Sequence, residues 1–442
     1  PRTDTQERGL DAFAEVILPL MRSRFGYLEM QIAGRHTDVE YQADIGNTGV
    51  RPHFSKFVPK YAVLYQPTDW MSLRGSYSEG FVTPTQGQVV GTQRQADRTA
   101  QDPTCYVLEN TYGIVLDAAN GYANSGCSYD VAGSSVSTSG EELVDVIGSN
   151  PNLGPQTSKA KSVGVSFRLL DGDLSIDLDY VDIDFLGEIR DILIRDRIPI
   201  EQERFNLGLL DACGGTPSAS CAASFRETWI TTPGLETNAF VRDGTLGPIR
   251  LHMGGPDNTT GRFVKAFDFR TSYRFSASQL PVIGGSWGSF RATLNGTYND
   301  SFQYHIGPDT PLREGAGHRN DCCGRQPIPR LRLNGALRYM YGDHTARVSV
   351  IWHSAVKDLD ATGAIPFSNK YGEIESQALV NLYYQYNWKI LPKMPGTLIS
   401  VNVANVFNDQ PRPLTDSSGI DPILMGTSPL GRMVTFRVQQ SF

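Results

Sequence analysis

Gly284, Ser286 and Gly288 fit the Gly-x-Ser-x-Gly spacing of a nucleophile elbow, the turn that presents the reactive serine of many hydrolases. That chemistry requires a strand before the serine, a helix after it, and a histidine and an acid brought close by the fold. The residues after Gly288 alternate between apolar and polar, which indicates a strand, and the expected strands place no histidine beside Ser286. We interpret the segment as a turn and expect that the protein is not an enzyme.

His318, Cys322 and Cys323 could bind a metal ion, since neutral imidazole and thiolates are zinc ligands. Adjacent cysteines chelate a tetrahedral ion poorly, so disulfide bonding in an exposed loop is the favoured interpretation, and no cofactor is expected. All six cysteines fall in long connections between predicted strands, which suits an oxidising exterior. The sequence leaves their connectivity open, but they are grouped along the chain. The disulfide candidates are Cys105 with Cys127, Cys213 with Cys221, and Cys322 beside Cys323.

Charged side chains recur on the polar faces of the predicted strands. Such groups could steer a charged solute through an enclosed, wet lumen. The alternative is a hydrated wall that packs against another domain, and the mixture of acidic and basic residues on these faces favours that alternative. The candidate ligand-binding residues are Arg270, Arg332, Arg338, Arg347 and His353. Further charges on the same faces are Asp177, Asp179, Asp268 and Arg291.

Side chains that share the polar face must be carried by β-strands. The alternation of apolar and polar residues that marks a strand is clearest in residues 327–358. Leu333 and Leu337 fall on one face while Arg332 and Arg338 fall on the other, which is the two-residue period of a pleated strand. The alternation resumes after a short turn, so the segment is a predicted hairpin. The same period predicts thirteen strands, at 9–20, 25–42, 51–66, 70–80, 157–170, 173–190, 258–276, 286–306, 327–341, 344–358, 373–389, 396–407 and 430–442.

The connections between these strands alternate in length, so that every second one is long. A soluble sandwich has no reason to gather its long loops at one end, whereas outer-membrane barrels have short periplasmic turns and long extracellular loops. Four tryptophans lie in predicted strands, three of them beside short turns, as expected of an interfacial aromatic girdle. The long connections are 43–50, 81–156, 191–257, 307–326, 359–372 and 408–429, and the four tryptophans are Trp70, Trp287, Trp352 and Trp388.

Composition limits the other classes of protein. No compositional break divides the 442 residues, so residues 1–442 are treated as one domain. No run of about 18 apolar residues could cross a bilayer as a helix. The net charge is −7 and the basic residues are scattered, which argues against a nucleic-acid partner.

Three segments, in this order along the chain, resemble the barrel of TonB-dependent outer-membrane receptors. Residues 67–84, PTDWMSLRGSYSEGFVTP, are similar to the family's periplasmic turn and a rising strand that closes with Tyr-Ser-x-Gly-Phe. Residues 150–158, NPNLGPQTS, resemble its Asn-Pro-Asn/Asp-Leu-x-Pro-Glu-Thr motif, and residues 401–409, VNVANVFND, resemble its penultimate strand. The aromatic carboxyl terminus at Phe442 is also typical of outer-membrane barrels. Val82, Thr83, Gly154 and Gln156 depart from the family pattern.

The resemblance implies an all-β, transmembrane, antiparallel up-and-down barrel in the outer membrane of a Gram-negative bacterium. Family members have about 22 strands around an N-terminal plug that carries the TonB box. This chain resembles roughly the last thirteen strands without the plug, so we expect its N-terminus at the extracellular rim, its C-terminus in the periplasm, and no closure or transport by this segment alone.

The resemblance also implies function and partners. The protein would bind a bulky, scarce extracellular solute and import it with energy from TonB, in contact with outer-membrane lipid. An iron–siderophore is the leading cargo, and cobalamin or an oligosaccharide is also possible for the family. Two alternatives stay open: a passive outer-membrane porin, and a secreted soluble β-protein that binds glycans.

Overall fold

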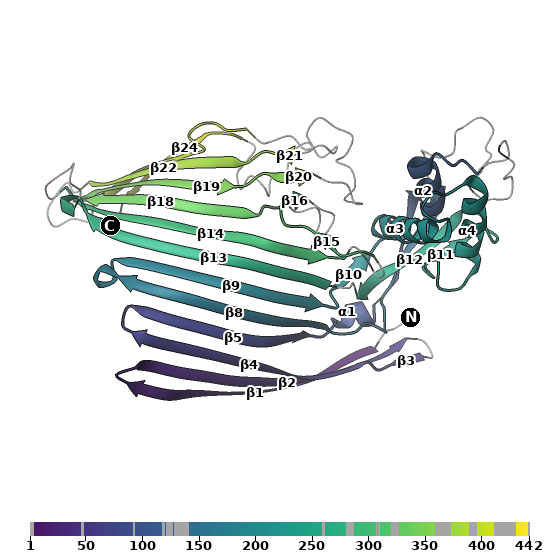
Figure 1. Ribbon diagram of the computed structural model, residues 1–442, viewed down its shortest axis with the longest axis horizontal. Coiled ribbons are helices and arrows are strands. Elements are labelled where there is room, and N and C mark those ends of the chain that lie inside the picture. Colours follow the sequence, from purple (N-terminus) through teal and green to yellow (C-terminus); the bar gives the residue numbers. More distant parts are fainter. Residues whose placement is uncertain are drawn as a thin grey trace.

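The computed structural model describes residues 4–440 except for short internal ranges. Those ranges are 46–47, 92, 117–119, 121–126, 128–140, 259–260, 280–286, 306, 308–309, 320–326, 359–372, 389–395 and 411–429. Thirteen long strands form one antiparallel sheet, each strand hydrogen-bonded to its neighbour in chain order (Figure 1). Each of the thirteen predicted ranges overlaps one of these strands, so the strand prediction is confirmed.

The strands of this main sheet follow one another without a crossover. Their bounds are β1 Asp4–Ser23, β2 Gly26–Ile45, β4 His53–Thr68, β5 Met71–Val82, β8 Gln156–Leu169, β9 Leu174–Leu186, β13 Gly261–Ser276, β14 Ser289–Tyr304, β18 Leu331–Tyr341, β19 His344–His353, β22 Gln377–Trp388, β23 Thr397–Ala404 and β24 Met433–Gln440. At the long-loop end, short strands β3 Thr48–Val50 and β15 Arg313–Glu314 pair with β2 and β14.

The apolar face of the main sheet is exposed instead of packed in a core. Val163 is 67% exposed, Phe267 47% and Tyr384 45%, although aromatic and branched side chains of a water-soluble sheet would be covered. Each of these residues alternates along its strand with polar side chains that face the other way. An exposed apolar band of this extent is the surface that a barrel presents to lipid.

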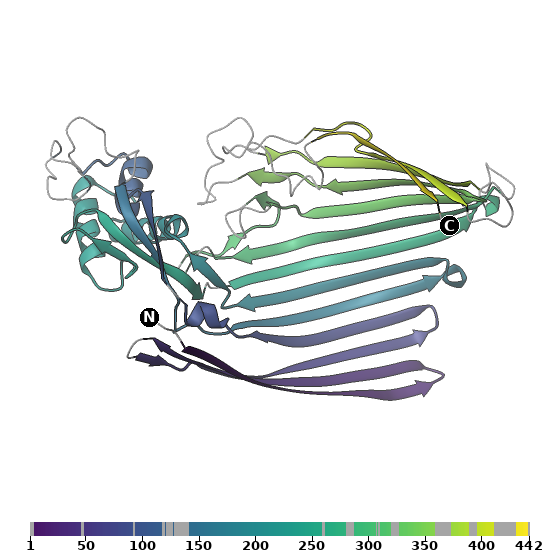
Figure 2. The same ribbon diagram turned by 180° about the vertical axis from the view of Figure 1, so that it is seen from behind.

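The two ends of the sheet differ in the length of their connections, as predicted. At one end the strands are joined by tight turns, such as the two-residue turn between β18 and β19, where Gly342 has a left-handed φ of 55°. Long segments join them at the other end. The start of the chain lies at the long-loop end and its end lies at the tight-turn end (Figures 1 and 2). Trp70, Trp287 and Trp388 lie at this end of the sheet and are about half exposed, which fits the predicted girdle.

Two of the long connections, predicted only as loops, contain helices and strands. Together they fold into a compact unit of helices and a small mixed sheet, which we call the lobe, at the long-loop end of the main sheet (Figures 1 and 2). Its elements are α1 Gln86–Val89, β6 Arg94–Ala100, α2 Pro103–Tyr112, β7 Glu141–Ile147, β10 Ile189–Ile192, α3 Ile194–Ala212, α4 Ala219–Thr231, β11 Phe240–Arg242 and β12 Ile249–Asn258. Helices α2 to α4 were not predicted, because the search for a two-residue period passes over helical segments.

The helices of the lobe bury a core of their own. Phe205 and Leu209, one turn apart on α3, are fully buried against Val107 and Leu108 of α2. Trp229 of α4 packs edge-on against Phe205, with ring centroids 5.6 Å apart. Buried aromatic and aliphatic side chains of this size each contribute roughly 1.5–3 kcal/mol, which makes the lobe a folded unit that can present a fixed surface.

Four further short elements lie at the same end of the molecule, β16 His318–Arg319, β17 Pro327–Ile328, β20 Val356–Asp358 and β21 Glu373–Ile374, and form a second small sheet. None of the described helices is both long enough and apolar enough to cross a membrane.

Candidate functional site

The register of the main sheet sorts the five predicted ligand-binding residues into three rows that run across the strands. Arg338 of β18 lies directly opposite Arg347 of β19, and Arg332 lies opposite His353 at the other end of the same two strands. Arg270 of β13 falls in a separate row, between Asp177 and Asn295. The sheet therefore brings the predicted residues together as two pairs and leaves Arg270 beside an acid.

The pair of Arg338 and Arg347 belongs to a longer row. Arg291 of β14 lies opposite Arg338, and Arg274 of β13 lies opposite Arg291, so arginines occupy matching positions on four successive strands. Arg274 is compensated by Asp173, with Nε 3.7 Å from Oδ1. The structure gives no ion pair for the other three within the described residues. We call Arg291, Arg338 and Arg347 the arginine row.

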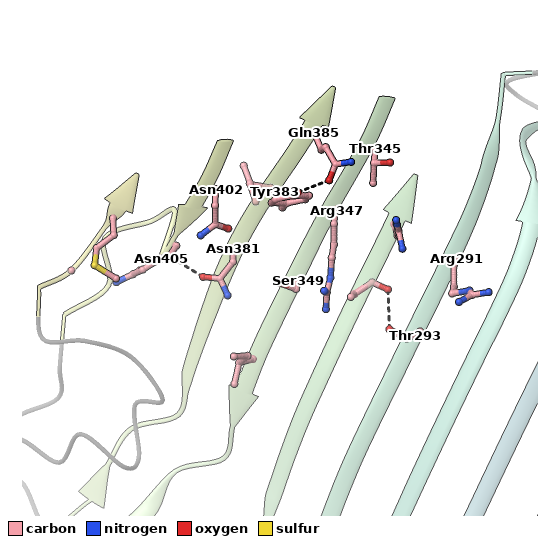
Figure 3. A pocket seen from close by; sticks show the side chains of 17 residues that line it. Arg291, Thr293, Thr345, Arg347, Ser349, Asn381, Tyr383, Gln385, Asn402 and Asn405 are labelled. Carbon is pink, nitrogen blue, oxygen red and sulfur yellow. Dashed lines mark hydrogen bonds between the residues drawn. The ribbon is translucent and has the colours of Figure 1, made fainter. Parts of the chain in front are cut away.

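The arginine row lines a cavity of about 810 Å³ on the polar face of the sheet (Figure 3). Within the described part of the chain, the cavity wall has no aspartate or glutamate. Its other polar groups are neutral hydrogen-bonding side chains from β14, β19, β22 and β23. They are Thr293, Thr345, Ser349, Asn381, Tyr383, Gln385, Asn402 and Asn405.

Asn405 closes one end of this cavity and shows what the segment 401–409 does. It has a left-handed φ of 53°, its Oδ1 accepts from the Asp409 amide at 2.8 Å, and its own amide donates to Asn381 at 2.9 Å. Asparagine tolerates this backbone conformation better than most residues. The motif thus turns the chain sharply after β23 and fixes the wall of the cavity.

Arg332 and His353 are engaged with the wall and do not line the cavity. The Arg332 guanidinium donates to the Pro327 carbonyl at 3.1 Å, and the His353 Nδ1–H donates to the Ser354 carbonyl at 3.0 Å. His353 is only 7% exposed. A ligand-binding role for these two residues and for Arg270 stays a prediction.

A network of charges on β5, β8 and β9 was only partly foreseen. Arg74 donates from Nε to Asp179 at 2.8 Å and from Nη1 to Ser166 at 2.6 Å, and Ser166 in turn donates to Asp177 at 2.6 Å. Arg168 also faces Asp177, at 3.3 Å. Because two arginines here meet two acids, this part of the polar face is neutralised within the sheet, unlike the arginine row.

At the long-loop end, two disulfides hold the helices of the lobe. The structure joins Cys105 to Cys127 and Cys213 to Cys221, which confirms disulfides at four of the six candidate cysteines. Cys322 and Cys323 lie outside the described residues, so the predicted disulfide there, and the alternative metal site with His318, stay untested.

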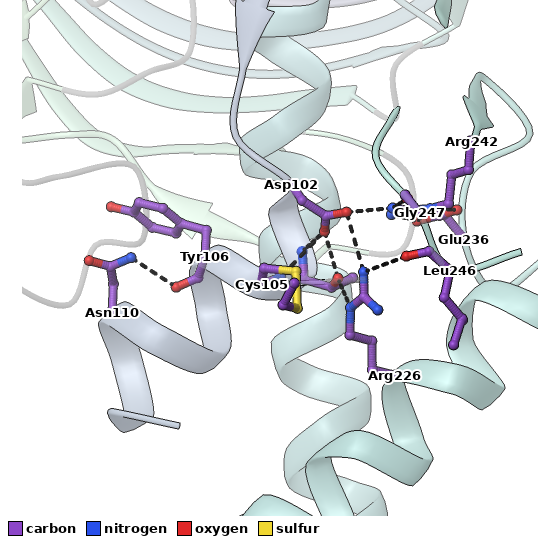
Figure 4. Close-up of a disulfide and its surroundings, with 11 residues drawn as sticks. Asp102, Cys105, Tyr106, Asn110, Arg226, Glu236, Arg242, Leu246 and Gly247 are labelled. Carbon is purple, nitrogen blue, oxygen red and sulfur yellow. Dashed lines mark hydrogen bonds and ion pairs between the residues drawn. A yellow bond between two sulfur atoms is a disulfide. The ribbon is translucent and has the colours of Figure 1, made fainter. Parts of the chain in front are cut away.

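A buried cluster of charges stabilises the same helices (Figure 4). Asp102 caps α2 by accepting from the amides of Thr104 at 2.9 Å and Cys105 at 3.3 Å. The same carboxylate binds the guanidinium groups of Arg226 on α4 and Arg242 on β11. Burial alone would raise the pKa of Asp102, but the charges of Arg242 and Arg226 outweigh burial and hold the pKa well below its ordinary value.

A second buried pair lies between β7 and β12. His252 is fully buried, and its Nδ1–H donates to Asp145 at 2.8 Å. Its Nε2 has no hydrogen-bond partner in the part of the chain that the structure describes. Burial, together with the charge of Arg197, lowers the pKa of His252 despite the opposing effect of Asp145. The pair joins β7 to β12 in the interior of the lobe.

Residues 150–158 attach the lobe to the rim of the main sheet. The Asn150 side chain donates to the Pro256 carbonyl at 3.2 Å, and the Gly154 amide donates to Asn258 at 2.7 Å. On the other side, Glu203 of α3 pairs with Arg313 at 2.6 Å. These contacts hold the lobe at the long-loop end of the main sheet.

The structure does not support the hydrolase interpretation. Gly284, Ser286 and their neighbours lie outside the described residues, but Trp287 leads directly into strand β14 and not into a helix. A nucleophile elbow needs a helix at that point. Among the described residues no group of three or more possible metal ligands comes together.

Comparisons with known proteins agree with this architecture. Residues 1–406 match the family model described as TonB dependent receptor-like, beta-barrel. No curated protein sequence matches the chain.

Solved structures give the same fold at low sequence identity. The ferric enterobactin receptor PfeA of Pseudomonas aeruginosa is 14% identical with a TM-score of 0.51, over 99% of this chain and 54% of the receptor. The siderophore receptor PirA of Acinetobacter baumannii is 12% identical with a TM-score of 0.50, over 99% and 55%. The pyoverdine receptor FpvA of Pseudomonas aeruginosa is 14% identical with a TM-score of 0.50, over 100% and 43%. The chain therefore spans about half the length of these receptors.

Proposed function

The chain belongs to the TonB-dependent receptor β-barrel family of the Gram-negative outer membrane, and from this premise we propose that it imports a ferric siderophore with energy supplied through TonB. Membership makes it part of a receptor and transporter, not an enzyme. An outer-membrane location also removes the soluble glycan-binding alternative.

The lobe at the long-loop end is the observation that carries this proposal. A passive channel needs no folded unit at its extracellular end, whereas here two long connections form a unit with two disulfides and a buried core of its own. Rigid, well-packed surfaces bind solutes with less loss of conformational entropy than flexible loops do. The lobe thus supplies a fixed surface at the long-loop end of the sheet, which suits capture of a bulky solute.

The chemistry of the polar face supports the same assignment. Ferric siderophores are large and carry many oxygen atoms that accept hydrogen bonds, and the lumen wall offers arginine, asparagine, glutamine and tyrosine donors. The receptors that share this fold include those for ferric enterobactin and pyoverdine. Polar hydrogen-bond donors also suit cobalamin and oligosaccharides. The cargo is therefore identified by an uptake experiment.

The proposal is tested in iron-limited cells that carry or lack the whole receptor to which this barrel belongs. We expect a radiolabelled ferric siderophore to accumulate at least roughly tenfold above the deletion strain. Deleting TonB, or collapsing the proton gradient, is expected to abolish accumulation while leaving binding at the cell surface unchanged, because capture needs no energy and passage does.

Two results would contradict the proposal. Accumulation that continues at full rate without TonB would make the protein a passive porin. Normal surface binding of cobalamin or an oligosaccharide, with none of any ferric siderophore in a panel of catecholates and hydroxamates, would reassign the cargo.

A further inference from the structure

The apolar face of the main sheet ends before its strands do. Along β9, Tyr180 belongs to this face, but the next two residues that point the same way are Asp182 and Asp184. Val181 and Ile183 point to the opposite face, so the alternation of apolar and polar residues is inverted from here to the long-loop end. Charged side chains on the lipid side mark the level at which hydrocarbon gives way to lipid headgroups.

Three lysines lie on the apolar face at this level. Lys161 of β8 and Lys265 of β13 lie opposite Asp182 from its two sides, and Lys159 of β8 lies opposite Asp184. All three lysines are exposed, and none forms an ion pair with a residue in the described part of the chain. We call them the lysine belt, and we propose that the belt binds the phosphate groups of a phosphorylated glycolipid in the outer leaflet. This goes beyond the proposed function, and it holds whatever cargo the receptor carries.

The lysine belt lies in the middle of the sheet and faces outward (Figure 1). Four strands of the main sheet precede β8, and six follow β13. Val163 and Phe267, which lie next to the belt on the same face, are 67% and 47% exposed. A plug inside the barrel and further strands at the edges of the sheet would both leave this surface open to the membrane.

The height of the belt fits a headgroup. Leu174, beside the tight turn, and Asp182 are eight residues apart on β9, which is roughly 26 Å along the strand. A strand tilted by about 40° therefore places Asp182 roughly 20 Å above the tight turns, and the apolar band of outer-membrane barrels is about 25 Å tall. Lysine side chains are long enough to reach over the few remaining ångströms to the headgroups. Because the long loops of these barrels are extracellular, the headgroups at this level belong to the outer leaflet.

The acids of this level leave the lysines free to bind a lipid. Asp182 and Asp184 are half-buried, and no lysine of the belt pairs with them in the described chain. Glu79 of β5, which lies opposite Lys159, already accepts a hydrogen bond from the Tyr77 hydroxyl at 2.7 Å. Carboxylates bind divalent cations, so a row in which lysine and aspartate alternate matches a layer in which lipid phosphates alternate with such cations.

The spacing of the lysines indicates the kind of lipid. Lys161 and Lys265 are separated by one strand, which puts their backbones roughly 10 Å apart. Each ammonium group is a compact charge on a flexible stem and can hold one phosphate. A glycolipid with two phosphates on a disaccharide headgroup therefore engages both lysines at once, whereas a phospholipid offers a single phosphate.

The test measures binding of lipid A, a disaccharide lipid with two phosphates, to the whole detergent-solubilised receptor by native mass spectrometry. Each lysine near an anionic lipid strengthens binding about fivefold, so Lys161→Gln/Lys265→Gln should weaken binding roughly 25-fold. Lys161→Arg/Lys265→Arg keeps both charges and should bind like the wild type. Lys60→Gln is the matched control, because Lys60 is an exposed lysine on the polar face of β4 and its loss should leave the affinity unchanged.

Heat-modifiable migration on SDS gels checks that each variant keeps its folded barrel. The proposal is wrong if Lys161→Gln/Lys265→Gln binds lipid A as tightly as the wild type, or if Lys60→Gln weakens binding as much. Equal binding of lipid A from which both phosphates have been removed would also overturn it, because the surface would then recognise acyl chains alone. Displacement of lipid A by excess inorganic pyrophosphate would assign the lysines to a soluble anion and not to a lipid.

Discussion

At the scale of single residues, charge and burial decide which arginines pair within the fold and which do not. Asp102, Arg226 and Arg242 are almost fully buried and satisfy one another, so they stabilise the lobe. Arg338 and Arg347 are exposed on the polar face and have no acid opposite them. Residue type alone does not separate these two groups of arginines; only their neighbours do.

His252 gives the lobe a dependence on pH. Its pKa is lowered by burial and by Arg197, with Asp145 opposing, so the unfolded chain binds a proton more readily than the folded lobe does. Stability is therefore complete above the ordinary histidine pKa of about 6.5 and falls as the pH drops below it, by at most about 1.4 kcal/mol per pH unit.

This dependence is measured by unfolding the lobe with urea at pH values between 7.5 and 5. Cleavage of the lobe by trypsin is the readout. His252→Gln should flatten the pH profile over that range. His36→Gln, an exposed histidine on β2, is the control and should leave the profile unchanged. An equally steep profile in His252→Gln would mean that another group is responsible.

At the scale of elements, Asp102 connects α2, α4 and β11. Asp102→Asn keeps an oxygen for the helix cap, because asparagine is as good an N-cap as aspartate. It removes the negative charge, however, and leaves Arg226 and Arg242 buried without it. Breaking a buried ion pair in this way costs about 3–5 kcal/mol, so we expect the lobe to open at a clearly lower urea concentration while the barrel stays folded.

Trypsin cleavage of the lobe across a urea gradient at pH 7 provides the measurement for Asp102→Asn. Asp243→Asn is the matched control in the same lobe, since Asp243 is exposed and its pairing with Arg250 at 3.5 Å is a surface contact. The control should shift stability by less than about 0.5 kcal/mol. Equal shifts in the two variants would show that the buried cluster does not hold the three elements together.

The strands of the main sheet show which parts of the fold can be predicted from the sequence. Strict alternation predicted every strand of the main sheet, because lipid on one side and a polar lumen on the other impose a period of two. The hairpin was predicted too, and in the structure its two-residue turn sets Arg338 opposite Arg347. The pairing of Arg291 with Arg338 could not be predicted, since a long connection separates β14 from β18 and leaves their register open.

The helices of the lobe did leave signals in the sequence. Asp102 followed by Pro103 is a helix start, and Gly113 ends the same helix with a φ of 65°. Phe205 and Leu209 have the spacing of one helical face. These signals were weak beside the strand pattern, and Pro199 inside α3 interrupts its helical signature.

At the scale of the whole molecule, one orientation underlies every functional statement: the apolar face meets lipid and the polar face meets the lumen. Leu294 and Asn295 are neighbours in the middle of β14 and point to opposite faces. Leu294 is 39% exposed on the apolar face, whereas Asn295 lies opposite Arg270, whose other neighbour is Asp177. The two positions share strand, depth and backbone, so they isolate the environment of each face.

An arginine at each position tests that orientation. Leu294→Arg should destabilise the barrel by about 2–4 kcal/mol, the cost of an arginine facing the bilayer midplane, and should reduce the folded fraction in lipid vesicles. Asn295→Arg should cost less than about 1 kcal/mol, because its charge enters a hydrated lumen and its repulsion from the directly opposed Arg270 is a single cross-strand contact of at most about 1 kcal/mol. The measurement is the urea dependence of folding into vesicles, read as the heat-modifiable fraction on gels. If Asn295→Arg were the more harmful change, the polar face would be the one in contact with lipid, and both the lumen and the arginine row within it would have to be abandoned.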